Sequence, residues 1–139
     1  WKKYQTTSGE QLNKIDTDLA PATAYLGILG MTGLTAYFGL TKIGEPKDGE
    51  TLVVSGAAGA VGTVVGQIGK IKGCKVIGTA GTDDKVELLK DKFGYDEAIN
   101  YKTTDNMKEA IASAAPNGVD VYFDNVGGDI TDAVLETQE

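Results

Sequence analysis

The chain has 139 residues, 41% of them hydrophobic and 24% charged, and its 13 basic and 20 acidic residues give a formal net charge of −7. This composition excludes an intrinsically disordered chain, and the excess of negative charge disfavours a surface for nucleic acid or for an anionic membrane. Histidine is absent and Cys74 is the single cysteine, so these residues supply no histidine base, no Cys/His zinc site and no internal disulfide.

Neither a membrane span nor a leader is visible. No apolar run reaches the roughly 18 residues that a transmembrane helix needs, and the first residues are unlike a signal peptide. We expect a soluble, cytoplasmic protein with no bound metal.

The pattern changes near residue 46. Residues 1–20 are polar, whereas residues 21–44 are small and apolar and predict a helix opened by Pro21 and another over 34–43, separated by a break at Gly30–Gly33. Tyr37 on the second helix is expected in the core. We therefore assign residues 1–46 to a connecting segment with helices, and residues 47–139 to a domain of its own.

Strands and helices alternate after that boundary. Apolar runs predict strands over 51–55, 75–80, 97–100 and 119–124, and helices over 59–71, 83–92, 105–115 and from 127 onward. This alternation is typical of an α/β fold with a doubly wound parallel sheet, right-handed crossovers and helices on both faces.

A glycine-rich turn joins the first strand to its helix. Within Ser55–Gly62, the small residues Ala57, Gly59 and Gly62 follow the spacing of a dinucleotide-binding fingerprint. In such a turn the first position permits the tight bend, the second lets the backbone approach a pyrophosphate, and the third lets the helix pack closely on the strand. The alternative is a close helix–strand contact without any ligand.

The residues after the second strand indicate which dinucleotide would bind. An NAD site places an acid roughly 20 residues after the fingerprint, but Gly81 stands there, followed by Thr82 and, in the next helix, Lys85. A cation without a competing acid favours the 2′-phosphate of NADP(H). Asp83 and Asp84 are expected to point outward as first-turn helix charges, and Lys85 could instead be a solvated lysine.

Several segments together resemble a known family. They are residues 30–40, 55–62, 66–68, 72–76, 100–102 and 122–128. In order, they are similar to the zinc-independent medium-chain dehydrogenase/reductases, and in particular to the branch of prostaglandin/leukotriene reductases and alkenal or 2-alkenone double-bond reductases. The resemblance covers essentially the whole chain and implies a Rossmann-type domain.

The resemblance also implies an activity and a set of cofactor contacts. It implies NADPH-dependent reduction of a C=C bond conjugated to a carbonyl in a small enone or alkenal, by a parent protein that forms a homodimer. The contacts it implies are Gly59, Ala60, Val61 and Gly62 at the pyrophosphate, Lys85 at the 2′-phosphate, Tyr101 near the adenosine phosphate and Asn125 after the fourth strand. It identifies no catalytic residue in this chain.

Members of the family are longer and carry a separate N-terminal catalytic domain. We therefore expect a cofactor-domain fragment with strand order 3-2-1-4, an exposed edge at the fourth strand that invites self-association, and negligible reductase activity. Quinone reduction, a non-catalytic nucleotide-binding module and a methyltransferase remain as alternatives. The absence of an acid at Gly81 counts against the methyltransferase.

Overall fold

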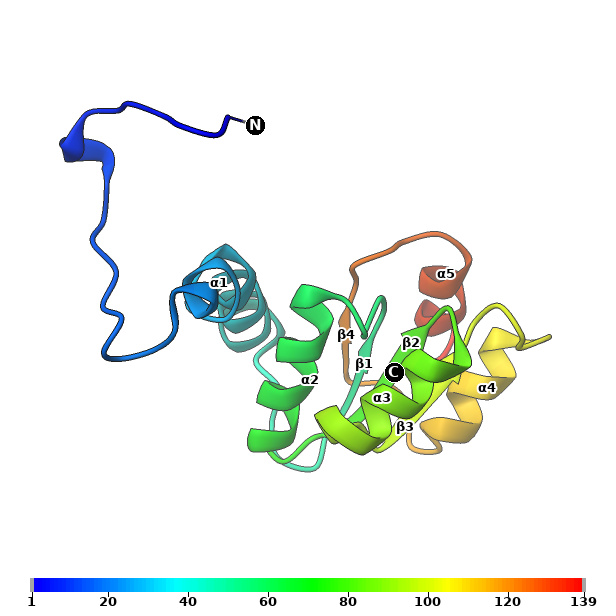
Figure 1. Ribbon diagram of the computed structural model, residues 1–139. Helices are drawn as coiled ribbons and strands as arrows, with labels where there is room; N and C mark the ends of the chain where they lie inside the picture. The colour runs from blue at the N-terminus through cyan, green and yellow to red at the C-terminus, as the bar shows by residue number, and fades with distance from the viewer. Residues whose placement is uncertain (1, 139) are drawn as a thin grey trace.

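A single parallel sheet organises the protein. The computed structural model describes residues 2–138, and its four strands lie in the order β3-β2-β1-β4 (Figure 1). The strands are β1 (Thr51–Val54), β2 (Lys75–Ala80), β3 (Glu97–Asn100) and β4 (Val121–Phe123). The predicted α/β class and the strand order 3-2-1-4 are confirmed.

Helices cover both faces of the sheet, as Figure 1 shows. They are α2 (Ala60–Ile71) and α3 (Asp83–Phe93) on one face, and α4 (Met107–Ala114) and α5 (Asp129–Leu135) on the other. Neighbouring residues of a strand point to opposite faces, so Val54 packs in a core with Val65 of α2, whereas Val53 packs in a second core with Ile111 of α4. The sheet is therefore doubly wound.

Local side chains set where the helices begin. Thr82 caps α3 by accepting a hydrogen bond from the N–H of Lys85. Asn106 caps α4 through the N–H of Glu109 at 3.2 Å, so this helix begins two residues later than expected. Gly128 adopts a positive φ of 68° just before α5. The elements predicted after residue 46 are thus present: β2 and β3 lie at their predicted bounds, and the other boundaries move by at most two residues.

The segment before the sheet differs from the prediction. A short 3₁₀ turn, η2 (Ala22–Leu26), precedes α1 (Met31–Phe38), which continues into a π-helical turn, η3 (Gly39–Gly44). The expected break is present but lies earlier than predicted, at residues 27–30 between η2 and α1, because Gly30 is the N-cap and Gly33 lies within the helix. A side chain at Gly33 would collide with the backbone of Ile28, so this glycine permits close packing rather than ending a helix.

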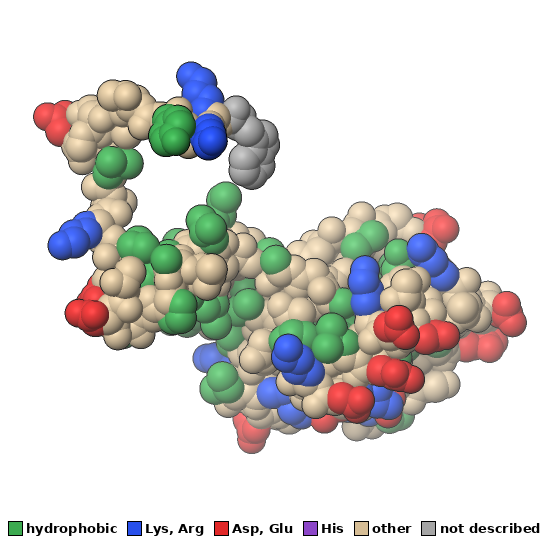
Figure 2. Space-filling view, viewed as in Figure 1, with side chains coloured by type: hydrophobic (Ala, Val, Ile, Leu, Met, Phe, Trp, Pro, Cys, Tyr) green, Lys and Arg blue, Asp and Glu red, His purple; other side chains and the backbone are tan. Residues whose placement is uncertain are grey.

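Tyr37 is also misplaced by the sequence. Its expected core position is wrong, because 51% of its surface is exposed while Ala36 and Leu40 are buried beside α2 and the sheet. Apolar side chains gather over the segment that holds α1, on the left of the molecule in Figure 2; besides Tyr37, the exposed ones include Leu26, Ile28, Leu29, Met31, Leu34 and Phe38. Contiguous apolar exposure of this kind is typical of a surface that contacts further protein.

The outer side of β4 is largely unpaired. The N–H of Asp120 bonds Thr51 in β1, and the N–H of Val119 points the other way, to the carbonyl of Thr137. Along β4 itself, in the part of the chain that the structure describes, β1 is the single strand partner. The expected edge without a second strand partner is therefore present, although the β4 residues are half-buried and η3 packs against Val121 and Phe123. The self-association expected from this edge stays a prediction. No helix among residues 2–138 is long and apolar enough to span a membrane.

Candidate cofactor site

The glycine-rich turn leaves β1 and enters α2 with its backbone fixed at both ends. The N–H of Ala57 donates to the carbonyl of Thr79 at 3.0 Å, which fastens the turn to β2. Gly56 adopts a φ of +56°, and the N–H of Gly59 returns to the carbonyl of Gly56 at 3.0 Å. This tight bend brings the start of α2 directly above the carboxyl end of β1.

Gly62 lets α2 approach that bend. A Cβ atom at Gly62 would lie 2.6 Å from the Cα and the carbonyl oxygen of Ala57 and from the carbonyl oxygen of Gly56. These are backbone atoms that cannot rotate away, so the position tolerates no side chain. The close helix–strand packing expected from the fingerprint is therefore present.

Tyr95 packs against α2 and was not among the residues predicted from the sequence. Its ring, 3% exposed, packs where side chains at Gly66 and Gly78 would otherwise lie, and its hydroxyl donates to the carbonyl of Gly62 at 2.7 Å. Burial raises the pKa of Tyr95 well above its ordinary value, so it stays a neutral donor. Gly66 on α2 and Gly78 on β2, which leave room for the ring, were the sequence signal that could have identified Tyr95.

The first turn of α2 presents unsatisfied donors. Among the described residues, the N–H groups of Ala60, Val61 and Gly62 have no protein acceptor, and α2 has no side-chain cap. With Asn125 they line a cleft of about 320 Å³. Because the helix dipole adds partial positive charge there, this cleft suits an anion.

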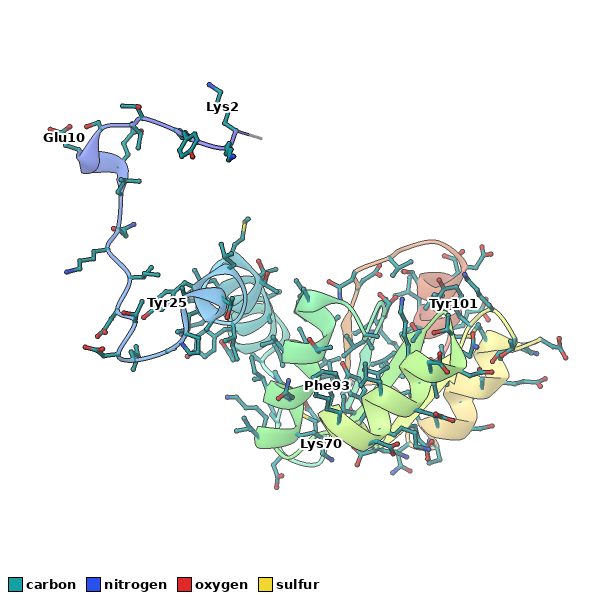
Figure 3. All side chains as sticks on the ribbon, in the orientation of Figure 1. Lys2, Glu10, Tyr25, Lys70, Phe93 and Tyr101 are labelled. Carbon is teal, nitrogen blue, oxygen red and sulfur yellow. The ribbon has the colours of Figure 1, made fainter. Side chains whose placement is uncertain are left out.

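A second cleft of about 240 Å³ adjoins the first and shares Gly56 and Gly59 with it. It brings together Gly81, Lys85 and Tyr101, three residues expected at the cofactor from the sequence. Figure 3 labels Tyr101 at the end of the sheet where β2 runs into α3. A third cleft of about 460 Å³ continues beyond Tyr101, so an extended groove follows the carboxyl ends of the strands.

Gly81 forms the floor of the second cleft. A Cβ atom there would lie 2.9 Å from the hydroxyl of Tyr101 and 3.3 Å from Cε of Lys102. The hydroxyl oxygen of Thr82 accepts the Lys85 N–H at 3.4 Å, so its established contact is the helix cap. The acid nearest to this floor, Asp83, is occupied, because the Asn100 amide donates to its carboxylate at 2.6 Å.

A hydrogen-bond network joins the ends of β1 and β4. The buried Ser55 hydroxyl donates to the Asp124 carboxylate at 2.8 Å and accepts the N–H of Asn125 at 2.8 Å. The Asn125 amide in turn donates to the Ser55 carbonyl at 2.9 Å. Asn125 is thereby fixed beside the first cleft. Sequence reasoning missed Ser55 and Asp124, although polar residues at the ends of adjacent strands were a signal.

The Asp124 carboxylate is bonded from several sides. Its other donors are the N–H groups of Val126 and Gly127 and the hydroxyls of Thr131 and Tyr122. Burial alone would raise the pKa of Asp124, but these N–H and hydroxyl donors outweigh it and hold the pKa well below its ordinary value. The carboxylate is therefore charged and fully engaged by the protein.

Metal chemistry has no visible basis in this part of the chain. Across residues 2–138, no group of three or more His, Cys, Asp or Glu side chains could hold a metal ion. Cys74 is buried, and burial raises the pKa of its thiol. The two clefts around the glycine-rich turn thus offer N–H groups, an amide, a tyrosine hydroxyl and Lys85, while Asp105 and Asp129 line the third cleft.

Comparison with protein families and curated proteins finds clear relatives. Residues 60–138 match the family model described as zinc-binding dehydrogenase. The chain is 65% identical over 135 residues to YfmJ of Bacillus subtilis (strain 168), 54% over 138 residues to prostaglandin reductase 1 of Mus musculus, and 50% over 136 residues to the 2-alkenal reductase (NADP(+)-dependent) of Nicotiana tabacum. Each match covers 97% of this chain but 40%, 42% and 40%, respectively, of the relative.

Solved structures give a similar result. CurA from Vibrio vulnificus in complex with NADPH superposes with a TM-score of 0.81 and 49% sequence identity. The match covers 86% of this chain and 36% of the CurA chain. The chain therefore spans well under half the length of these four relatives.

Proposed function

Because the chain belongs to the zinc-binding dehydrogenase family of medium-chain dehydrogenase/reductases, we propose that it is the NADP(H)-binding part of an oxidoreductase. The parent enzyme reduces the C=C bond of α,β-unsaturated ketones or aldehydes. In this proposal residues 1–46 form a connecting segment with helices, and residues 47–139 form the cofactor domain. The observation that carries it is the groove, which offers unpaired N–H groups at the start of α2 and Lys85 in the adjoining cleft.

The residues of the groove fit the successive parts of the dinucleotide. The N–H groups of Ala60, Val61 and Gly62 bind the pyrophosphate, because the bend at Gly59 carries no side chain that would block it. Asn125, fixed by Ser55, orients the cofactor beyond the pyrophosphate. When bound, NADPH supplies the hydride that reduces the substrate.

The other end of the groove selects NADP(H) over NAD(H). Lys85 and Tyr101 line the cleft above Gly81, and this proposal assigns the 2′-phosphate of the adenosine ribose to that cleft. The absence of a carboxylate at Gly81 removes the repulsion that an NAD-type acid would create. Asp83 keeps its charge, but its carboxylate accepts the Asn100 amide and is thereby directed toward β3.

The chemistry of substrate reduction requires more than this chain. The matched relatives are more than twice as long as the segment aligned to it, and the exposed apolar face over α1 fits contact with further protein. We therefore assign no catalytic residue here, propose a zinc-independent, homodimeric parent, and expect negligible turnover of an enone by the isolated chain. Full-length parent assayed with enones and with quinones distinguishes the alternative of quinone reduction.

Calorimetric titration of the 139-residue chain tests the cofactor assignment. We expect NADPH to bind more tightly than NADH, and S-adenosylmethionine not to bind. Lys85→Ala should weaken NADPH about tenfold, as expected for loss of one charge-assisted contact, and leave NADH within about twofold. Lys72→Ala at the far end of α2 is the control for net charge. Equal affinity for NADPH and NADH in the wild-type chain would overturn the proposal.

A further inference from the structure

The 2′-phosphate position has a second lysine close to it. The Cε atom of Lys102, which carries the ammonium group, lies 3.3 Å from the position that a Gly81 side chain would occupy. Lys85 lines the cleft above Gly81 from α3, whereas Lys102 approaches Gly81 from the turn after β3, at the border of that cleft. Two lysines from different elements therefore lie near Gly81.

Lys102 is free to bind an anion. It is exposed, and the ion pairs among residues 2–138 involve Lys70, Lys90 and Lys108 rather than Lys102. A phosphate monoester carries about −1.5 to −2 charges at neutral pH. A single lysine leaves much of this charge unbalanced, and two lysines neutralise it.

The backbone of Lys102 is fixed although its side chain is free. The Asn100 amide oxygen accepts the N–H of Lys102 at 3.0 Å, while its amide nitrogen donates to Asp83 at 2.6 Å. The N–H of Tyr101 also donates to the carbonyl of Ala80 at 3.1 Å. The Asn100 side chain thus joins the start of α3 to the turn after β3, and the Asp83 carboxylate points toward the Asn100 amide.

We propose that Lys102 is a second specificity-determining cation for the cofactor 2′-phosphate, opposite Lys85, and that Asn100 is the positioning residue that holds it there and occupies Asp83. This rests on the proposed NADP(H) binding and deepens it, because selectivity then depends on two elements. A variant that keeps Lys85 but lacks the Lys102 charge should bind NADP(H) with reduced selectivity.

Adenosine 2′,5′-bisphosphate and adenosine 5′-monophosphate test this, because they differ only in the 2′-phosphate. In calorimetric titrations of the 139-residue chain, Lys102→Gln should weaken binding of the bisphosphate about 5- to 10-fold. This is the effect expected for loss of one charge-assisted contact, reduced because the lysine is exposed to solvent. The monophosphate should change by less than about twofold. Lys102→Arg should keep bisphosphate affinity, and Lys72→Gln controls for net charge.

The outcomes separate the two proposals. If the wild-type chain binds neither nucleotide, the proposed cofactor function fails and this inference fails with it. If the wild-type chain prefers the bisphosphate and Lys102→Gln weakens both nucleotides equally or neither, the inference alone is overturned.

Asn100→Ala tests the positioning role. We expect this substitution to weaken binding of the bisphosphate and not of the monophosphate. In a chain that already carries Lys102→Gln, it should lower bisphosphate affinity by less than about a further twofold, because the two residues act through one contact. Full additivity would show that Asn100 does not act through Lys102. Unchanged affinity in Asn100→Ala would overturn its role.

Discussion

Where β1 and β4 end, the polar groups of the protein bind one another, whereas beyond the end of β2 the lysines face solvent without partners. Ser55, Asp124 and Asn125 form a closed network at the first place. Lys85 and Lys102 flank Gly81 at the second. The groups at the first end are held in place by the protein itself, and in the proposed function an anion would provide the partner for the lysines at the second. Substitutions at the network should therefore change stability, and substitutions at the lysines should change selectivity.

We expect the largest effect at Gly62, because the glycine-rich turn against which it packs lines both clefts of the groove. Gly62→Val places a side chain against backbone atoms of Gly56 and Ala57, so the turn must move. Overpacking of this kind costs about 3 kcal/mol or more of unfolding free energy, and NADPH binding should be lost. Thermal melting and titration measure both. Gly9→Ala, with no atom within 4 Å of the new Cβ, is the matched control, and an unchanged melting temperature in Gly62→Val would contradict the close contact.

Asp124→Ala tests the network end alone. Removing the carboxylate leaves the buried Ser55 hydroxyl and the N–H groups of Val126 and Gly127 without their acceptor. We expect a loss of about 1–3 kcal/mol in unfolding free energy, with the bisphosphate-to-monophosphate affinity ratio unchanged. Asp105→Ala removes the same charge from an exposed position and should melt like the wild type. If the affinity ratio changed while the melting temperature did not, the network would control selectivity rather than stability, contrary to the comparison of the two ends.

The Asp124 network also predicts a pH dependence. Hydrogen-bond donors hold the pKa of Asp124 below its ordinary value, so its charged form stabilises the fold above the unfolded-state pKa of about 4, and this contribution is lost as pH falls toward the depressed folded-state pKa. The melting-temperature difference between the wild type and Asp124→Asn should stay constant from pH 7 to about pH 4 and shrink below it. A difference that grows on acidification would show that the charge does not stabilise the network.

The sequence predicted periodic and backbone features better than side-chain pairs distant in the chain. The alternation of strands and helices and the close helix contact at Gly62 follow from local spacing, the family resemblance implied the strand order, and β2 was predicted at its observed bounds. The bond between Ser55 and Asp124 joins residues 69 apart, and no local pattern pairs them. Gly33 misled the prediction because a glycine that permits a close helix contact has the same signature as one that ends a helix.

Thr82 should give the smallest effect, and it sharpens the comparison because it is a polar group at the open end that already has a partner. Its hydroxyl oxygen caps α3 through a long 3.4 Å bond to the Lys85 N–H, so Thr82→Ala should cost about 0.5–1 kcal/mol of unfolding free energy, and Thr82→Ser should restore it. If capping is its main role, the bisphosphate-to-monophosphate affinity ratio changes by less than about twofold, against the roughly 5- to 10-fold expected for Lys102→Gln. A tenfold fall in that ratio with unchanged melting would instead place the hydroxyl on the phosphate, and the open end would then contain a neutral donor as well as its two lysines.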